Sequence, residues 1–223
     1  MSWTWNEMAE YTLKCTKDTL SASRLTALLS DLCNELYAHR PGDDTTIAVM
    51  RVINRNREHF TGPPKSKDDD ERMVREFMSE EGTKVVSGGT SANIMARVLQ
   101  KNIVTSVNYQ DSSVPPTAAI EGLDLVTEGV LTLGKALKLL KKYERDDFDV
   151  EFFDELDADN GASRLARLLI EECTDIHLFV GTATNEAHQN SNLPFDLSIR
   201  MNLVEQLQEV ARKMGKQVCV RYY

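Results

Sequence analysis

Helix and strand patterns alternate along most of this chain, and this alternation limits the possible folds more than any other feature. After Gly62-Pro63-Pro64, apolar residues recur at three- and four-residue steps and then in short runs rich in β-branched residues, and the alternation continues to the C-terminus. It predicts strands at residues 83–86, 103–107, 118–120, 176–180 and 217–222, with further strand character at residues 123–126. Helical patterns follow residues 83–86, 123–126 and 176–180. This order predicts an α/β fold with a mostly parallel sheet and helices on both faces.

The first quarter of the chain has a different pattern. Residues 5–20 indicate one helix, and Ser21 or Ser23 can cap a second helix whose leucines form a single apolar stripe. Residues 46–53 form an apolar run that predicts a central strand. A polar connector with Gly-Pro-Pro follows it. We therefore expect an N-terminal segment at residues 1–54, a linker at residues 55–67 and an α/β domain at residues 68–223.

Two adjacent carboxylates stand directly before that apolar run. Pro41 and Gly42 are expected to form a turn, and Asp43 and Asp44 close it at the start of the predicted strand. Carboxylate oxygens suit Mg²⁺ or Mn²⁺, and a strand start fixes the direction of the ligands. Asp43 and Asp44 are therefore candidate metal ligands. The alternative is a polar turn before a core strand.

The segment Asp43-Asp44-Thr45-Thr46, with the apolar run behind it, resembles the last motif of the metal-dependent type 2C serine/threonine protein phosphatases. The bacterial group represented by the stage II sporulation protein E phosphatase is similar also in the preceding helix, here residues 19–37. The resemblance implies that Asp43 binds one of two Mn²⁺ or Mg²⁺ ions, with Asp44 as the less favoured ligand. It also implies that residues 1–54 are two helices and a strand left from a phosphatase α/β sandwich.

The other metal ligands of that family lie in Asp-Gly motifs well upstream, and these 223 residues contain no Asp-Gly pair. We therefore expect this chain to be the C-terminal portion of a phosphatase. The whole protein is expected to hydrolyse phosphoserine in a phosphoprotein through a metal-bound hydroxide. The chain alone is expected to be inactive and to bind metal weakly. A central strand without its sheet neighbours has open edges, so we also expect self-association.

A strand, a Gly-Gly turn and a helix start follow each other at residues 85–93. Backbone N–H groups at such a helix start bind anions, and Thr90 or Ser91 adds a hydroxyl donor. The alternative is a tight turn in which one of these hydroxyls caps the helix. The segment also resembles the region after the catalytic motif in sporulation-type phosphatases from anaerobic bacteria.

A second loop, residues 121–129, carries three carboxylates between a predicted strand and a helix, and solvated loop side chains are the alternative reading. Ligands of open α/β sheets bind beyond the carboxyl ends of the strands. We therefore expect the two loops to lie together and to form a pocket for a small anionic ligand. A phosphorylated or amine-bearing metabolite, or a metal–phosphate pair, would suit such a mixture of amides and acidic groups. The candidate residues are Ser87, Gly88, Gly89, Thr90, Ser91, Glu121, Asp124 and Glu128.

Two further polar loops have simpler explanations. Asn185, Glu186 and His188 follow a predicted strand without a nucleophile beside them, so loop polarity and capping are favoured over acid–base chemistry. Residues 157–161 have the composition of a calcium loop but lack the glutamate expected at its end. A helix-start turn capped by Asp or Asn is favoured there.

Charge and composition disfavour several function classes. The chain has 26 Lys and Arg against 35 Asp and Glu, and the net charge of −9 disfavours binding to nucleic acid or to an anionic membrane. No apolar run approaches the ~20 residues of a membrane span, and the four dispersed cysteines form no Cys-x-x-Cys pair. We expect a cytoplasmic protein without nucleic-acid or membrane partners. Two functions compete with the phosphatase fragment: a non-enzymatic module that binds a phosphate-bearing small molecule and regulates a partner, and an independent enzyme with its site at Glu121, Asp124, Glu128 and His188.

Overall fold

The computed structural model describes residues 3–18, 21–40, 42–52, 57–60, 62–105, 115–146, 148–183 and 195–223. The chain forms two compact units. The N-terminal unit consists of Met1–Asn54 with Phe148–Glu155, and the C-terminal unit consists of Arg55–Asp147 with Leu156–Tyr223. No helix in the described ranges is both long enough and apolar enough to cross a membrane.

Two helices make up most of the N-terminal unit: α1 (Trp5–Asp18) and α2 (Ala22–Leu36). The second begins at Ser21, whose side chain accepts a hydrogen bond from the Arg24 backbone N–H at 3.4 Å, so the expected serine cap is confirmed. The helices share a small core of Cys15, Leu25 and Leu29, and Ile47 and Val49 pack against it.

The strand expected at residues 46–53 is wrong for its described part. Residues 44–52 adopt no regular secondary structure, and residue 53 lies outside the described residues. Ile47 and Val49 contact the helices, whereas Met50 and Val52 are 92% and 91% exposed. A β-branched run forms a strand only where it packs on a sheet surface with hydrogen-bonding neighbours. Here the packing comes from α1 and α2, and it uses only one side of the run.

The C-terminal unit contains a seven-stranded mixed sheet in the order β3-β4-β5-β2-β1-β6-β7. The pairs β5–β2, β2–β1, β1–β6 and β6–β7 are parallel, and β3–β4 and β4–β5 are antiparallel. The mostly parallel α/β sheet expected from the alternating pattern is therefore present. The strands are β1 (Arg57–Phe60), β2 (Thr83–Ser87), β3 (Val104–Thr105), β4 (Ala118–Ala119), β5 (Leu125–Thr127), β6 (Asp175–Val180) and β7 (Gln217–Tyr222).

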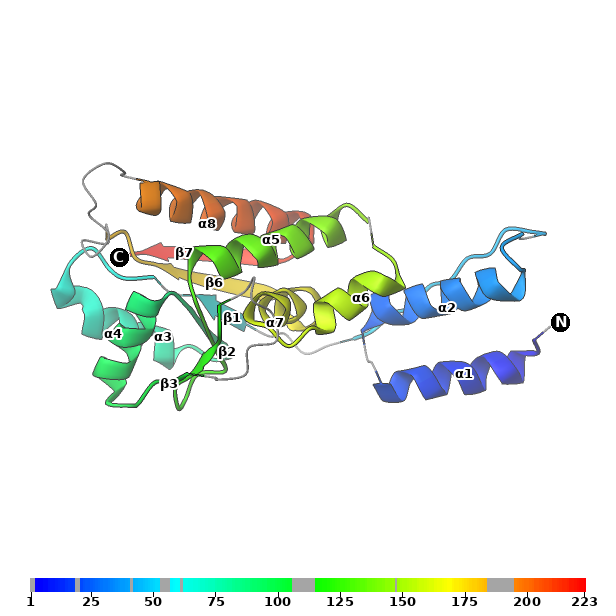
Figure 1. The fold of residues 1–223 in the computed structure, drawn as a ribbon, viewed down its shortest axis with the longest axis horizontal. Helices are drawn as coiled ribbons and strands as arrows, with labels where there is room; N and C mark the ends of the chain where they lie inside the picture. Colours follow the sequence, from blue (N-terminus) through cyan, green and yellow to red (C-terminus); the bar gives the residue numbers. More distant parts are fainter. Residues whose placement is uncertain are drawn as a thin grey trace. The chain divides into compact units, whose positions relative to one another are not determined.

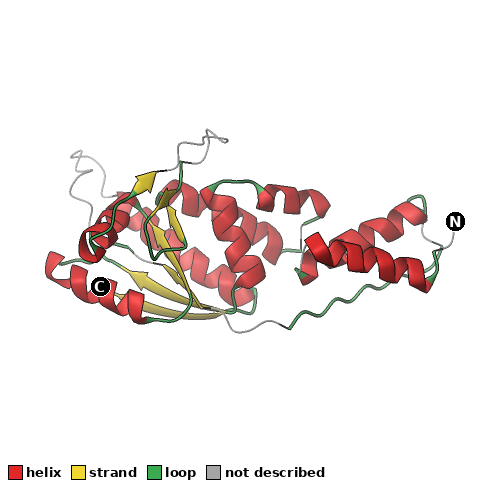
Figure 2. Ribbon diagram, turned by 90° about the horizontal axis from the view of Figure 1, so that it is seen from below, coloured by secondary structure: helices red, strands yellow, loops and turns green. Residues whose placement is uncertain are grey.

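Helices cover both faces of this sheet (Figures 1 and 2). On one face α3 (Asp70–Ser79) and α4 (Gly89–Leu99) bury Phe77 and Met95 against Val86, Val126 and Phe179. On the other face lie α5 (Val130–Glu144), α7 (Gly161–Arg167) and α8 (Phe195–Lys213). Shorter elements complete the chain: η1 (Lys67–Asp69), α6 (Val150–Asp157) and a π-helical turn, η2 (Leu168–Glu172).

The segment expected to be a linker, residues 55–67, contains an interior strand of the sheet, β1. β1 lies between β2 and β6 and pairs in parallel with both. Its polar sequence does not predict an interior strand. Strand pairing uses backbone N–H and C=O groups, which are present whatever the side chains are. The Gly-Pro-Pro segment after β1 is buried, and a Cβ on Gly181 would lie 1.6 Å from the Pro63 carbonyl oxygen. Only glycine fits at that close approach.

Candidate anion-binding site at the end of the sheet

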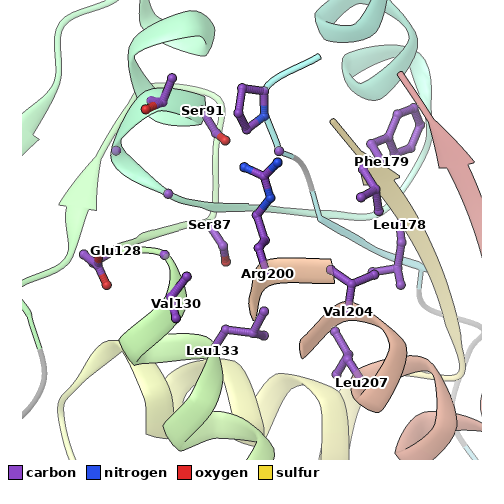
Figure 3. Close-up of a pocket in the computed structure, with 17 residues that line it drawn as sticks. Ser87, Ser91, Glu128, Val130, Leu133, Leu178, Phe179, Arg200, Val204 and Leu207 are labelled. Atoms are coloured by element: carbon purple, nitrogen blue, oxygen red, sulfur yellow. The ribbon is translucent and has the colours of Figure 1, made fainter. Parts of the chain in front are cut away.

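A cavity of about 390 Å³ opens at the carboxyl ends of the parallel strands in the C-terminal unit (Figure 3). Its walls come from the turns after β1, β2 and β5, from the end of β6, and from helices α4, α5 and α8. The lining residues are Gly62, Pro63, Ser87, Gly88, Gly89, Thr90, Ser91, Glu128, Gly129, Val130, Leu133, Leu178, Phe179, Val180, Arg200, Val204 and Leu207.

Hydrogen bonds join the turns after β2 and β5. The Ser87 and Thr127 hydroxyl oxygens lie 3.1 Å apart, and the Gly88 N–H donates to the Thr127 carbonyl at 2.9 Å. Gly88 has φ +114°, a conformation that favours glycine, and a Cβ on Gly129 would lie 3.5 Å from the Gly88 Cα. The two glycines therefore allow two strand-to-helix turns to meet at one point.

Two helix N-termini line the cavity, and no side chain in the described part of the chain caps either of them. Gly88 is the N-cap of α4 and Gly129 is the N-cap of α5. The first backbone N–H groups of a helix have no partner inside it, and they mark the positive end of the helix dipole. Where side chains do not satisfy these groups, an anion can do so. The alternative reading, in which the Thr90 or Ser91 hydroxyl caps the helix, is not what the described residues show.

The Ser91 side chain adds a hydroxyl to this region. Ser91 is 3% exposed, and its Oγ has no hydrogen-bond partner among the described residues. Figure 3 shows this hydroxyl directed toward the cavity. Native proteins pair most buried hydroxyls, because an unpaired one loses its hydrogen bonds to water without replacement. A ligand oxygen in the cavity would supply the missing partner.

Arg200 reaches the cavity from α8 on the opposite wall. Its Nη2 donates to the carbonyl oxygens of Gly181 and Ala183, each at 2.9 Å. It is the only cationic side chain among the described lining residues. A guanidinium carries five N–H donors in a planar fork that suits phosphate and carboxylate oxygens. Arg200 can therefore hold these carbonyls and still contact an anion.

The structure brings together only part of the second candidate loop with the Gly-Gly turn. Glu128 follows β5 and lines the cavity, whereas Glu121 and Asp124 precede β5 and do not line it. The Glu121 carboxylate lies 2.7 Å from the Lys101 ammonium. Asp124 Oδ2 accepts the Lys84 backbone N–H at 2.7 Å, so it stabilises the start of β2.

The candidate metal ligands lie on an exposed bend of the N-terminal unit. Asp43 Oδ1 accepts the Asp44 N–H at 2.9 Å, and the described residues directly after it, 45–52, form no strand. Both side chains line a wide cavity of about 580 Å³, together with Asp31 and Asp149. Among the described residues no group of three His, Cys, Asp or Glu side chains is placed to hold a metal. The metal-site expectation therefore depends on the sequence resemblance alone.

The remaining candidates are simple to place. Asn185, Glu186 and His188 lie outside the described residues. Asn160 is the N-cap of α7, and its side chain accepts the N–H groups of Ala162 and Ser163, each at 3.0 Å. The favoured interpretation of residues 157–161, a capped helix start, is confirmed.

Sequence reasoning missed Arg200 and the apolar lining residues. Arg200 belongs to a helix that the sequence predicts, but nothing in the sequence distinguishes it from Arg212 on the same helix. Comparisons of the chain with protein-family models, with curated proteins and with solved structures found no match.

Proposed function

We propose that the C-terminal unit is a non-enzymatic binding module for a small molecule that carries a phosphate group, and that the bound molecule regulates a partner. The observation that carries this proposal is the buried Ser91 hydroxyl, which has no partner in the described chain and points into a cavity lined by two uncapped helix N-termini. These groups are all hydrogen-bond donors that belong to residues lining the same cavity.

A phosphate group matches this set of donors. It offers several strong acceptor oxygens around one centre, and it carries the negative charge that helix N-termini and Arg200 favour. Donors on three elements, α4, α5 and α8, surround the cavity, so they can contact different oxygens of one group. The position at the carboxyl ends of parallel strands is also where open α/β sheets bind ligands.

Titration of the full chain with inorganic phosphate, followed by amide NMR, tests the proposal. We expect the amide signals of Gly89, Ser91 and Val130 to shift. Ser91→Ala should weaken phosphate binding about tenfold, the value of one hydrogen bond to a charged group. The same substitution should leave the free energy of unfolding unchanged or raise it slightly, because the lost hydroxyl had no partner.

Two matched controls separate binding from folding. Ser163→Ala removes an equally buried hydroxyl that accepts a hydrogen bond from Asn160, so it should lower stability without changing phosphate affinity. Arg200→Met should weaken phosphate binding, whereas Arg212→Met on the same helix should not. The proposal would be contradicted if phosphate caused no shift of these amide signals. It would also be contradicted if the shifts persisted unchanged in both Ser91→Ala and Arg200→Met.

A further inference from the structure

The cavity has two chemically different ends. Ser91 and the Gly88-Gly89 turn form the polar end, and Figure 3 shows Arg200 between it and a group of apolar side chains. That apolar end comes from three elements, α5, β6 and α8. Its residues are Val130, Leu133, Leu178, Val204 and Leu207.

From this division we infer that the ligand is a nucleoside phosphate, with its phosphate at the polar end and its base at the apolar end. The inference rests on the proposed function and specifies its ligand. A phosphate alone occupies only the polar end. The cavity of about 390 Å³ falls within the roughly 300–1,000 Å³ of small-molecule sites, which are mostly apolar with a few placed polar groups.

The apolar end disfavours a sugar phosphate as the whole ligand. The walls contributed by Leu133, Leu178 and Leu207 carry no side-chain donor or acceptor, so sugar hydroxyls placed there would lose hydrogen bonds to water without replacement. A flat aromatic base buries apolar surface against such walls at little cost in conformational freedom. The exposed edge of the base can keep its polar atoms near Arg200 or solvent.

Glu128 gives the site a further distinguishing feature. This carboxylate lines the cavity beside the N-terminus of α5, where it opposes the binding of a bare anion. A carboxylate is an acceptor for hydroxyl donors, and the pair of hydroxyls on a ribose is the standard partner of an acidic residue in nucleotide sites of α/β sheets. Glu128 therefore favours a ligand that presents hydroxyl groups between its phosphate and its base.

The topology supports the same ligand class. Along the five parallel strands the order is β5-β2-β1-β6-β7, so the chain moves outward in one direction from β1 and then returns to its other side at β6. Ligands of doubly wound sheets bind where the strand order reverses. The cavity is lined by residues directly after β1 and at the end of β6. This argument is an analogy of fold, and the cavity chemistry carries the inference.

Isothermal titration calorimetry of the full chain against inorganic phosphate, ribose 5-phosphate and the four ribonucleoside monophosphates tests the inference. We expect at least one nucleoside monophosphate to bind at least ten times more tightly than ribose 5-phosphate. The corresponding nucleoside without phosphate should bind at least ten times more weakly than its monophosphate. Equal affinity for all phosphate compounds would overturn the inference and keep the proposed function, whereas no binding of any phosphate compound would overturn both.

Two kinds of variant test the geometry. Val204→Phe fills the apolar end from α8, and it should weaken nucleotide binding at least tenfold while inorganic phosphate binding stays unchanged. Leu133→Phe is a second filling variant from α5, for use if the first does not fold. Ile199→Phe, on an exposed residue of α8 outside the cavity lining, is the matched control. Nucleotide affinity that is unaffected by both filling variants would overturn the inference.

Glu128→Gln should change the affinities for inorganic phosphate and for a nucleoside monophosphate in opposite directions. Loss of the negative charge should strengthen binding of inorganic phosphate severalfold, because a repulsive charge leaves the cavity. The same change should weaken nucleoside monophosphate binding severalfold, because an acceptor for ribose hydroxyls loses its charge. A variant that strengthens both to the same degree would show that Glu128 contacts no ribose, and the inference would fail.

Discussion

The hydroxyl oxygens of Ser87 and Thr127 lie 3.1 Å apart at the carboxyl ends of two neighbouring parallel strands, β2 and β5. The Gly88 N–H strengthens the same junction by donating to the Thr127 carbonyl. The helices that begin after these strands are α4 and α5, whose N-termini line the cavity. One partly buried hydroxyl pair therefore helps to set the spacing between the two helix N-termini.

Thr127→Val should lower the free energy of unfolding by about 1 kcal/mol, the usual value of one intramolecular hydrogen bond. Thr127 is 4% exposed, and valine keeps its shape while removing the hydroxyl. Thr132→Val is the matched control, because Thr132 is 0% exposed and its hydroxyl has no partner in the described chain. That substitution should be neutral or stabilising. Urea denaturation measures both, and equal losses would contradict the role given to the hydroxyl pair.

The two glycines of the Gly-Gly turn should respond differently to alanine. Gly88→Ala places a side chain at φ +114° and should cost about 1–3 kcal/mol. A Cβ on Gly89 would meet no atom of the described residues within 4 Å, and this residue is the first of α4. Gly89→Ala should therefore keep stability or raise it by up to about 1 kcal/mol. Thermal unfolding measures the stability of the two variants. If Gly88→Ala were more stable than Gly89→Ala, the assigned backbone conformation would be contradicted.

Tyr223 should make stability depend on pH above 10. Burial raises the pKa of its phenol from 10.0 to about 12, and the hydrogen bond that it donates to Glu76 acts in the same direction. A raised pKa means that the fold favours the neutral phenol. The contribution of this group to stability is therefore complete below pH 10 and is lost as pH rises toward 12.

The measurement is the urea midpoint of the wild type minus that of Tyr223→Phe at a series of pH values. The difference should shrink as pH rises above 10. Burial lowers the pKa of Lys84, and that group acts with the opposite sign, but it is present in both proteins and cancels in the difference. Tyr222→Phe, at the exposed neighbouring residue, is the control. A difference that stays constant across this range would contradict the prediction.

The phosphatase resemblance predicts an inactive chain, because Asp43 supplies at most one ligand of a site for two metal ions. We expect no Mn²⁺-dependent release of phosphate from a phosphoserine peptide above background, for the wild type and for Asp43→Asn alike. The informative control is Asp31→Asn, since Asp31 lines the same cavity as Asp43. Hydrolysis that requires Mn²⁺ and is lost in Asp43→Asn but kept in Asp31→Asn would show that the metal site is functional in this chain.

Exposed apolar residues in the N-terminal unit predict self-association. Met50 and Val52 are almost fully exposed, and they lie on a stretch that forms no strand in the described residues. Burying them against a second copy removes apolar surface from water. The double substitution Met50→Ser and Val52→Ser should reduce association in sedimentation experiments, whereas Leu131→Ser, on an exposed leucine of α5, should not. A wild type that stays monomeric at high concentration would contradict this prediction.

The sequence alone was sufficient to predict the helices and most strands of the C-terminal unit. Each of these elements buries one face, and the spacing of its apolar residues indicates which face that is. The strand at β2 and the helix at α4 lie where the pattern predicts them, as does the Gly-Gly turn between them. The same reasoning failed at β1 and at residues 46–52. Strand formation there depends on which backbone neighbours are available, and residue type does not encode it locally.

The candidate site also contains residues that the sequence predicts and residues that only the tertiary structure brings together. Residues 87–91 are visible in the sequence as a strand, a glycine turn and a helix start, because their chemistry is local. The sheet order alone brings the turn after β5 beside the turn after β2, and it separates Glu128 from Glu121 and Asp124. Arg200, Val204 and Leu207 reach the cavity because α8 packs across the face of the sheet. These residues lie more than a hundred positions after the Gly-Gly turn, and only the tertiary structure brings them to it.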